Sequence, residues 1–241
     1  MKIVILAAGR GTRLGNSLPK SLTWLEDGTT ILQRQISAYL REARVQDIYL
    51  VVGYGKEHIM DACPRAGFIY NERFAATNTA MSLLCALEMF DDEDVVWSNG
   101  DVVFDPRVLE RVMDCSGSCM AVNAGAVAEE EVKYTLSRHG YIAQLGKEIS
   151  SGVGEALGIN KICRKNLATF RAMLRQCDDK DYFERGLEAG IGDGLELSPV
   201  DVSDLFCVEI DFPADLKRVN EHLTSQNRRH GTLATLEVAA R

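Results

Sequence analysis

The first half of the chain alternates short apolar runs with longer segments in which apolar residues recur every three or four positions. Short apolar runs bounded by Gly, Asp or Pro are typical of the buried strands of a parallel sheet. The longer periodicity predicts amphipathic helices. The predicted strands are residues 3–7, 47–52, 67–70, 94–99 and 119–123, and the predicted helices are 30–42, 79–90 and 105–113. This alternation predicts an α/β fold with a doubly wound, mostly parallel mixed sheet flanked by helices.

The second half of the chain is less regular, although it still predicts a hairpin, further strands and helices. There is no internal repeat and no low-complexity linker, so we predict a single domain over residues 1–227. Residues 228–241 begin with Arg-Arg-His-Gly and are expected to form a separate tail that starts with a basic turn. The predicted elements are a hairpin over 133–137 and 141–145, a strand over 154–163, helices over 164–177, 181–190 and 213–226, and one or two strands near 195–210.

Composition excludes several classes of protein. The 241 residues are 46% hydrophobic and 26% charged, with a net charge of -8, so no long-range field attracts nucleic acid. No apolar run approaches the length of a membrane span, and the N-terminus lacks the pattern of a signal peptide. The seven cysteines are odd in number and include no CxxC pair, so we expect reduced thiols and a cytoplasmic protein.

Glycines and basic residues gather directly after the first predicted strand. Glycine lets backbone N–H groups approach phosphate oxygens closely, and basic side chains add charge. Gly15 is followed by Asn and Ser rather than Lys-Ser/Thr, which excludes a Walker loop, and Pro19 interrupts the helix that a dinucleotide fingerprint would need. The segment 7–20 therefore predicts a different phosphate-binding loop. Its relevant residues are Gly9, Arg10, Gly11, Arg13, Gly15 and Lys20.

The pattern Leu-Ala-Ala-Gly-x-Gly-Thr-Arg-Leu over 6–14, followed by Pro19-Lys20, resembles the signature of the nucleotide-diphospho-sugar pyrophosphorylase superfamily. Within that superfamily the chain most resembles phosphocholine and phosphonate cytidylyltransferases. The resemblance implies a Rossmann-like core related to GT-A folds, in which this loop wraps the triphosphate. Arg13 and Lys20 would contact the phosphates and the transition state. The loop residues expected to bind nucleotide are Leu6, Ala7, Ala8, Gly9, Gly11, Thr12, Arg13 and Lys20.

Two carboxylates are the candidate metal ligands. Asp101 follows a glycine at the carboxyl end of the fourth predicted strand, and magnesium prefers carboxylate oxygens. Asp211 lies in Glu-Ile-Asp, a motif that resembles one in cytidylyltransferases whose aspartate completes the Mg²⁺ site. With Arg13 and Lys20, these aspartates form the predicted catalytic set. Three other aspartates are weaker candidates, because Asp105 fits a helix cap, and Asp201 and Asp204 have no matching motif.

The segment after the third predicted strand resembles the family's base-recognition segment, and cytosine as the base rests on that similarity. Asn78 has an alternative role as the N-cap of the helix that follows. The residues expected to contact the nucleoside are Asn71, Thr77, Asn78, Thr79, Asn99 and Gly100.

Residues 128–200 are expected to contribute the acceptor pocket. Tyr182 and Glu184 match the Tyr-x-acid pattern of choline-type relatives, in which an aromatic and acidic cage surrounds an ammonium group. The upstream tryptophan of those relatives is missing, and Lys133 in that region would repel a quaternary ammonium. This departure favours an acidic, hydroxylated or phosphonate acceptor. The predicted acceptor contacts are Lys133, Lys147, Glu155, Tyr182, Glu184 and Glu209.

These features predict an enzyme that transfers CMP from CTP to a small phosphate- or phosphonate-bearing acceptor and releases pyrophosphate, with Mg²⁺ as cofactor. Its partners would be CTP and that acceptor, without nucleic acid or membrane, and the protein would be a monomer or homodimer. Two alternatives stay open: a sugar-1-phosphate nucleotidyltransferase that uses UTP or dTTP, and a non-catalytic nucleotide sensor. A GT-A glycosyltransferase is disfavoured because the segment around Asp101 lacks its Asp-x-Asp motif.

Overall fold

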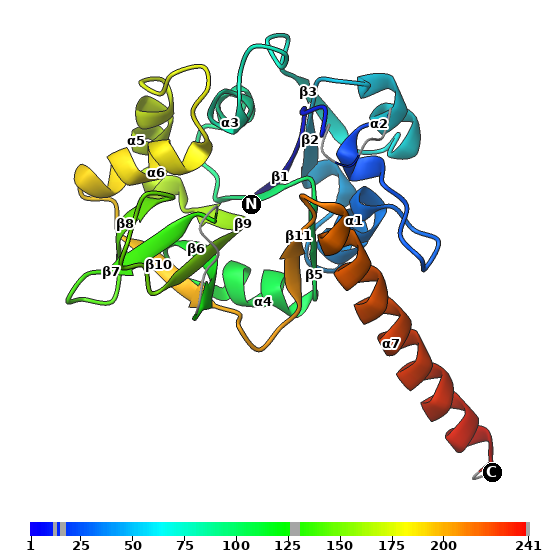
Figure 1. The fold of residues 1–241 in the computed structure, drawn as a ribbon. Helices are drawn as coiled ribbons and strands as arrows, with labels where there is room; N and C mark the ends of the chain where they lie inside the picture. Colours follow the sequence, from blue (N-terminus) through cyan, green and yellow to red (C-terminus); the bar gives the residue numbers. More distant parts are fainter. Residues whose placement is uncertain (12–13, 15–17, 126–130, 240–241) are drawn as a thin grey trace.

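The computed structural model describes residues 1–11, 14, 18–125 and 131–239. Its centre is a mixed sheet with the strand order β10-β6-β9-β4-β1-β2-β3, to which β7 and β8 add a hairpin beside β9 (Figure 1). Strands β1, β2, β3 and β4 are mutually parallel, as are β6 and β10, while β9 runs antiparallel between β4 and β6. The predicted fold class is confirmed. The strand bounds are β1 Lys2–Ala7, β2 Ile48–Val52, β3 Gly67–Tyr70, β4 Val95–Asn99, β6 Ser118–Ala124, β7 Lys133–Leu136, β8 Ile142–Gly146, β9 Gly154–Ile162 and β10 Leu197–Asp201.

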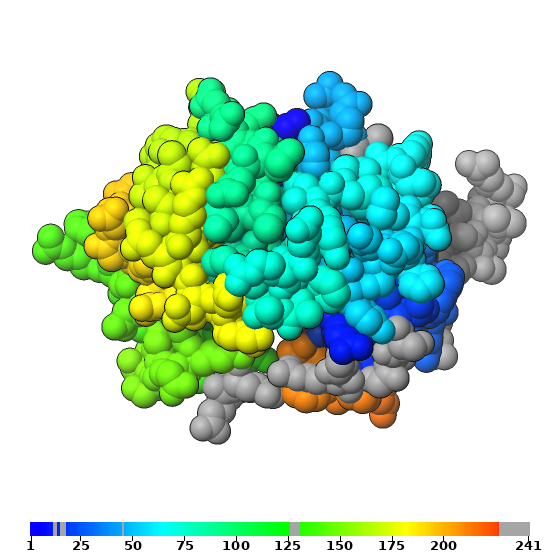
Figure 2. Space-filling view, turned by 90° about the horizontal axis from the view of Figure 1, so that it is seen from above, coloured from blue at the N-terminus to red at the C-terminus, as the bar shows by residue number. Residues whose placement is uncertain are grey.

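Helices cover both faces of the sheet, because the side chains of its central strands alternate between two apolar cores. From β1, Ile3 and Ile5 point into the core under α1 and α4, while Val4 and Leu6 point into the core under α3, α5 and α6. Figure 2 shows α3 between the yellow α5–α6 layer and the cyan residues around β3. The helix bounds are α1 Ile31–Glu42, α2 Lys56–Ala62, α3 Thr79–Leu87, α4 Arg107–Asp114, α5 Arg164–Leu174, α6 Phe183–Gly192 and α7 Pro213–Ala239.

Trp97 on β4 anchors the core beneath α5 and α6. Its ring is fully buried, stacks on Phe170 at 5.5 Å between centroids and meets the edge of Phe183 at 5.6 Å. Phe183 begins α6, so the packing of this tryptophan fixes where α6 starts. The two residues on either side of Phe183, Tyr182 and Glu184, are thereby positioned at the end of the sheet.

A second, two-stranded sheet links the end of the chain to the middle of the fold. Strand β11, Cys207–Glu209, runs antiparallel to β5, Val102–Phe104, with Val208 opposite Val103. The pairing continues past the strand, because Ile210 N–H donates to the Asp101 carbonyl at 3.0 Å. The Glu-Ile-Asp segment is therefore held directly beside Asp101.

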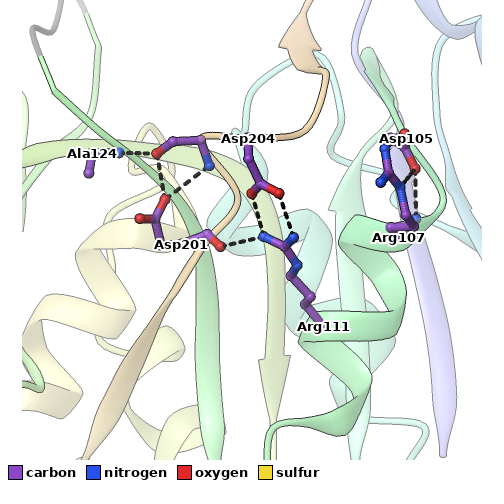
Figure 3. Close-up of polar contacts among 7 residues, drawn as sticks. Asp105, Arg107, Arg111, Ala124, Asp201 and Asp204 are labelled. Atoms are coloured by element: carbon purple, nitrogen blue, oxygen red, sulfur yellow. Dashed lines mark hydrogen bonds and ion pairs between the residues drawn. The ribbon is translucent and has the colours of Figure 1, made fainter.

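Polar contacts also fix the connection between β10 and β11 (Figure 3). The Arg111 guanidinium on α4 donates to both carboxylate oxygens of Asp204, at 2.6 and 2.7 Å, and to the Asp201 carbonyl at 3.0 Å. The Asp201 carboxylate accepts hydrogen bonds from the Ser203 backbone and hydroxyl. These aspartates therefore stabilise a connection rather than line the candidate site.

Asp105 lies one residue before Pro106, the N-cap of α4, and its side chain stabilises the start of that helix. Its carboxylate accepts hydrogen bonds from the Arg107 backbone N–H at 3.0 Å and from the Arg107 guanidinium (Figure 3). The guanidinium beside it holds the pKa of the Asp105 carboxyl below its usual range.

Three elements differ from the sequence prediction. Helix α2 was not predicted, and neither was β5 as a strand of its own sheet. The predicted last helix, 213–226, was too short, since α7 continues to Ala239 where a basic turn was expected. A single internal glycine, Gly231, costs a helix only about 1 kcal/mol and does not end it. Figure 1 shows α7 extending beyond the rest of the fold. Within the described ranges, none of the helices combines the length and the apolar character that crossing a membrane requires.

Candidate active site

The site begins where β1 and β4 end side by side. In their parallel register Leu6 lies opposite Asn99, so the chain leaves both strands at the same edge of the sheet. Gly100 N–H donates to the Leu6 carbonyl at 2.9 Å, and a Cβ at Gly100 would lie only 2.6 Å from that oxygen. The turn therefore requires glycine, and it delivers Asp101 beside the loop that follows β1.

The side chain of Gln35, on α1, stabilises this turn through hydrogen bonds to the backbone on both sides of it. Its side chain is 1% exposed, and its Nε2 donates to the carbonyls of Asn99 and Val102, each at 2.8 Å. The helix itself is fixed by a capping box in which Thr30 and Gln33 bond each other's backbone N–H groups. The position of Asp101 therefore depends on a buried side chain that the sequence prediction did not include.

Three carboxylates meet at this point. One oxygen each from Asp101, Glu209 and Asp211 lies within 4.8 Å of the others. Burial, together with the neighbouring charges of Asp101 and Asp211, raises the pKa of the Glu209 carboxyl well above its usual range. Glu209 was predicted as an acceptor contact, and the structure places it within the acidic cluster.

Lys20 lies between two of these carboxylates. Its Nζ is 2.7 Å from Asp101 Oδ2 and 2.6 Å from Asp211 Oδ1. Burial alone would lower the pKa of the Lys20 ammonium, but the two carboxylates outweigh burial and hold this pKa above its ordinary value. The predicted catalytic residues Lys20, Asp101 and Asp211 are therefore in direct contact.

The donor set of this cluster fits a divalent cation. Asp101 Oδ1 is buried without a hydrogen-bond partner among the described residues, and the other carboxylates supply further oxygens. Hard oxygen ligands of this kind suit Mg²⁺, which is commonly held by one or two carboxylates together with substrate phosphates. The acidic group could therefore hold a metal ion.

A cleft of about 720 Å³ extends from this cluster across the end of the sheet. It joins a smaller pocket that is lined by Leu6, Ala7 and Gly100 at the end of β1. Predicted site residues from the nucleotide and acceptor halves thus face one continuous space. The predicted residues that line the cleft are Gly9, Gly11, Lys20, Thr77, Asn78, Thr79, Asn99, Asp101, Lys147, Tyr182, Glu184, Glu209 and Asp211.

Some predicted nucleotide contacts lie elsewhere. Ala8 is 5% exposed and belongs to the core, and Thr12 and Arg13 lie outside the described residues. Asn71 is 2% exposed, and its Nδ2 donates to Thr77 Oγ1 and Ser82 Oγ, each at 3.0 Å. Asn71 is not among the described residues that line the cleft, but its side chain stabilises the turn before α3 and so positions Thr77, which does line it.

At the other end of that turn, Asn78 both caps α3 and faces the cleft. Its Oδ1 accepts from Thr79 N–H at 2.9 Å, and its Nδ2 donates to the Lys180 carbonyl at 3.3 Å. Thr79 Oγ1 accepts from Phe183 N–H at 3.1 Å. The start of α3 is therefore tied to the start of α6, which connects the nucleotide side of the cleft to the acceptor side.

Two predicted acceptor residues, Lys133 and Glu155, are bonded to neighbouring residues and are not part of the described cleft lining. Lys133 Nζ donates to the Lys147 carbonyl at 2.9 Å, and Asn123 Nδ2 donates to Glu155 Oε1 at 3.0 Å. Among the described residues that line the cleft, neither Lys133 nor Glu155 is present. Lys133 instead supports the loop that carries Lys147.

Two further cations line the cleft, Arg10 and Lys180. Arg10 was named in the predicted phosphate-binding loop but not among the predicted nucleotide contacts, and Lys180 was not predicted. The Arg10 guanidinium lies 4.9 Å from the centroid of the Tyr54 ring, which steadies it beside the loop. Arg10 was visible as a basic residue among the glycines, although it occupies the variable position of the signature. Lys180 lies in an irregular connection, where no motif or periodicity marks it.

Glu184, beside Tyr182, has a perturbed carboxyl group. The side chain is partly exposed, but its Oε2 is buried without a hydrogen-bond partner among the described residues. Burial raises the pKa of the Glu184 carboxyl to about 7, although a backbone hydrogen bond and the charge of Lys147 act in the opposite direction.

This perturbed acid predicts a pH-dependent stability. The carboxyl keeps its proton to about pH 7 in the folded protein but ionises near 4.5 when unfolded, so folding is favoured less as pH rises between these values. Glu184→Gln has no carboxyl to ionise, so it should not lose this stability. We expect its free energy of unfolding, relative to that of the wild type, to be about 2–3 kcal/mol higher at pH 8 than at pH 4.5. Urea unfolding without divalent cations, followed by tryptophan fluorescence, measures this. Glu196→Gln reports the loss of a surface charge alone. If the difference in free energy of unfolding between Glu184→Gln and wild type did not change with pH, the raised pKa of Glu184 would be contradicted.

Comparison with known families extends these observations. The family model of the MobA-like NTP transferase domain matches residues 3–173. The CMP-5'-(3-aminopropyl)phosphonate synthase of Streptomyces rubellomurinus is 27% identical over 264 residues, covering 98% of this chain and 41% of that protein. The chain therefore spans less than half the length of this curated relative.

Solved structures share the fold at low sequence identity. The inositol-1-phosphate CTP transferase of T. maritima superimposes with a TM-score of 0.77 at 20% identity, covering 91% of this chain and 93% of that one. The CTP:phosphocholine cytidylyltransferase of Streptococcus pneumoniae gives a TM-score of 0.72 at 18% identity, covering 92% and 98% of the two chains. At these identities the likeness concerns the fold alone.

Proposed function

Because the chain belongs to the family of MobA-like NTP transferase domains, we propose that it transfers CMP from CTP to a small phosphate- or phosphonate-bearing acceptor. The observation that carries this proposal is the continuous cleft, in which the glycine-rich loop, the acidic cluster and the Tyr182–Glu184 corner face the same space. A nucleotide and a small acceptor can lie there end to end. The similarity over 98% of the chain to a CMP-phosphonate synthase supports cytidine and a phosphonate-type acceptor.

The proposed reaction is an in-line displacement. An anionic oxygen of the acceptor attacks the α-phosphorus of CTP, a new P–O bond forms, and the bond to the β-phosphate breaks to release pyrophosphate. No general base is needed, because the nucleophile is already an oxyanion. The protein then contributes alignment and neutralisation of charge. Lys20 and Arg10 are cations that face the cleft beside the glycine-rich loop, and Arg13 completes the proposed set from the same loop.

We propose Mg²⁺ as the cofactor, held by Asp101 and Asp211 with Glu209 beside them. When bound, the ion would neutralise phosphate charge and orient the reacting groups. We further propose that residues 1–227 form one catalytic domain, with 128–200 supplying acceptor contacts, and that the protein acts in the cytoplasm as a monomer or homodimer. The seven cysteines, all free thiols, support a reducing compartment.

A pyrophosphate-release assay tests the function. We expect turnover with CTP and Mg²⁺ in the presence of at least one of phosphocholine, phosphoethanolamine, 2-aminoethylphosphonate, 2-hydroxyethylphosphonate or a phosphorylated amino acid. CTP should exceed UTP and dTTP by about tenfold or more in kcat/KM, and chelation of the metal should abolish release. Turnover of UTP or dTTP with a sugar 1-phosphate would favour the sugar-nucleotide alternative. Binding of CTP without turnover of any acceptor would favour a nucleotide sensor.

A further inference from the structure

One corner of the cleft brings together three side chains from two separate elements. Tyr182 precedes α6, Glu184 lies in its first turn, and Lys147 directly follows β8, which packs against α6. All three line the cleft. Tyr182 is 47% exposed, so its ring is available on the cleft side. We call this group, Lys147, Tyr182 and Glu184, the acceptor corner.

The acceptor corner already contains a cation. Lys147 Nζ lies 5.4 Å from the centroid of the Tyr182 ring, which is within the range of a cation–π contact. The Lys147 backbone is held in turn by the bond from Lys133 Nζ to its carbonyl, at 2.9 Å. An aromatic face beside a carboxylate would otherwise suit an ammonium group of a ligand. Here the ammonium of Lys147 lies over the Tyr182 ring instead, so it would repel a positively charged group of a ligand.

Glu184 leaves a hydrogen-bond acceptor open in the same corner. Its Oε2 is buried and has no partner among the described residues, although the charge of Lys147 acts on its carboxyl. A buried oxygen of this kind favours a donor from the ligand. Above about pH 7, where Glu184 is ionised, its carboxylate would repel an anionic ligand group, and Lys147 would repel an ammonium. A hydroxyl group suits both neighbours, because it donates to one and accepts from the other.

The acceptor corner and the acidic cluster belong to one cleft. Lys147, Tyr182 and Glu184 line the same space as Asp101, Glu209 and Asp211. A short acceptor can therefore extend from one to the other, with its phosphate or phosphonate at the cluster and its opposite end at the corner.

We infer that the acceptor carries a hydroxyl group opposite its phosphate or phosphonate, received between Glu184 Oε2 and Lys147 Nζ, and that Lys147 discriminates against acceptors with an ammonium group there. This inference rests on the proposed function and narrows its acceptor class. It makes Lys147 a specificity-determining residue, whose charge acts on the choice of acceptor.

Two acceptors that differ in this one group test the inference. We expect wild-type kcat/KM with CTP and Mg²⁺ to be about tenfold or more higher for 2-hydroxyethylphosphonate than for 2-aminoethylphosphonate, mainly through KM. Lys147→Met should reduce that ratio by about tenfold or more, because it removes both the donor and the repelling charge. Lys147→Arg keeps the charge and should keep the preference. Lys165→Met, on an exposed lysine of α5 outside the cleft, should leave the ratio unchanged.

The outcomes separate the inference from the function on which it rests. A wild-type preference for the ammonium acceptor, or an unchanged ratio in Lys147→Met, would overturn the inference while leaving cytidylyl transfer intact. Absence of transfer to the whole acceptor panel would overturn the proposed function, and the inference with it. Circular dichroism of each variant confirms that the ratios compare folded proteins.

Discussion

Replacing Asp101 by Asn is expected to lower kcat/KM for CTP by about a hundredfold or more while the protein stays folded. The substitution keeps the shape of the side chain but removes its charge from the centre of the acidic cluster. The Asp101 backbone is unaffected, because its turn is held by Gln35 and by the bond from Ile210 N–H. The expected loss therefore concerns metal and phosphate binding rather than folding.

Initial rates of pyrophosphate release over a range of Mg²⁺ concentrations measure this effect. Asp105→Asn is the matched control, since Asp105 lies on the same segment but pairs with Arg107 away from the cleft. The control should retain activity within about threefold of wild type, because neither Asp105 nor Arg107 is among the described residues that line the cleft. The metal dependence of Asp101→Asn should shift to higher Mg²⁺. Turnover like that of wild type would remove Asp101 from the mechanism.

The sequence predicted the sheet well because its central strands are buried on both faces. Strands β1 and β4 were expected at 3–7 and 94–99, and they span Lys2–Ala7 and Val95–Asn99. Helix α2 escaped prediction because its only buried residue is Ile59, which leaves no apolar face to detect. The pairing of β5 with β11 was not predicted for another reason. Each strand has only three residues, which are too few to show a periodic pattern of apolar and polar residues.

For the site as well, features with a local sequence pattern could be predicted, and contacts between distant segments could not. The signature identified the family, which the match to residues 3–173 confirms. The end of the fourth predicted strand predicted Asp101 as a site residue, and the structure brings Asp101 together with Glu209 and Asp211. Contacts between distant segments could not be predicted. Nothing local to Gln35 indicates that it holds the Asp101 turn, or that Lys147 lies over Tyr182. Lys133 was expected to repel an acceptor that carries an ammonium group. Because β7 pairs with β8, the Lys133 side chain instead donates a hydrogen bond to the Lys147 carbonyl.

Replacing Lys20 by Met is expected to separate catalysis from metal binding. Methionine retains the apolar stem but removes the ammonium that bonds Asp101 and Asp211 at 2.7 and 2.6 Å. Turnover should fall about a hundredfold or more, because the variant loses the ammonium that neutralises charge on the triphosphate at this point of the cleft. Without metal, the free energy of unfolding should fall by about 1–3 kcal/mol, since the carboxylates then repel one another without compensation.

Divalent cations should reverse that loss of stability more strongly in Lys20→Met than in wild type. In the wild type an added ion must compete with the Lys20 ammonium for Asp101 and Asp211, whereas in the variant both carboxylates accept it directly. Any ligand that binds only the folded state raises stability with its concentration, so the midpoint of thermal unfolding reports this affinity. The variant should therefore show a larger rise in midpoint with Mg²⁺ or Mn²⁺ and yet little turnover. Equal responses to metal in the two proteins would show that Lys20 and the ion do not share these carboxylates.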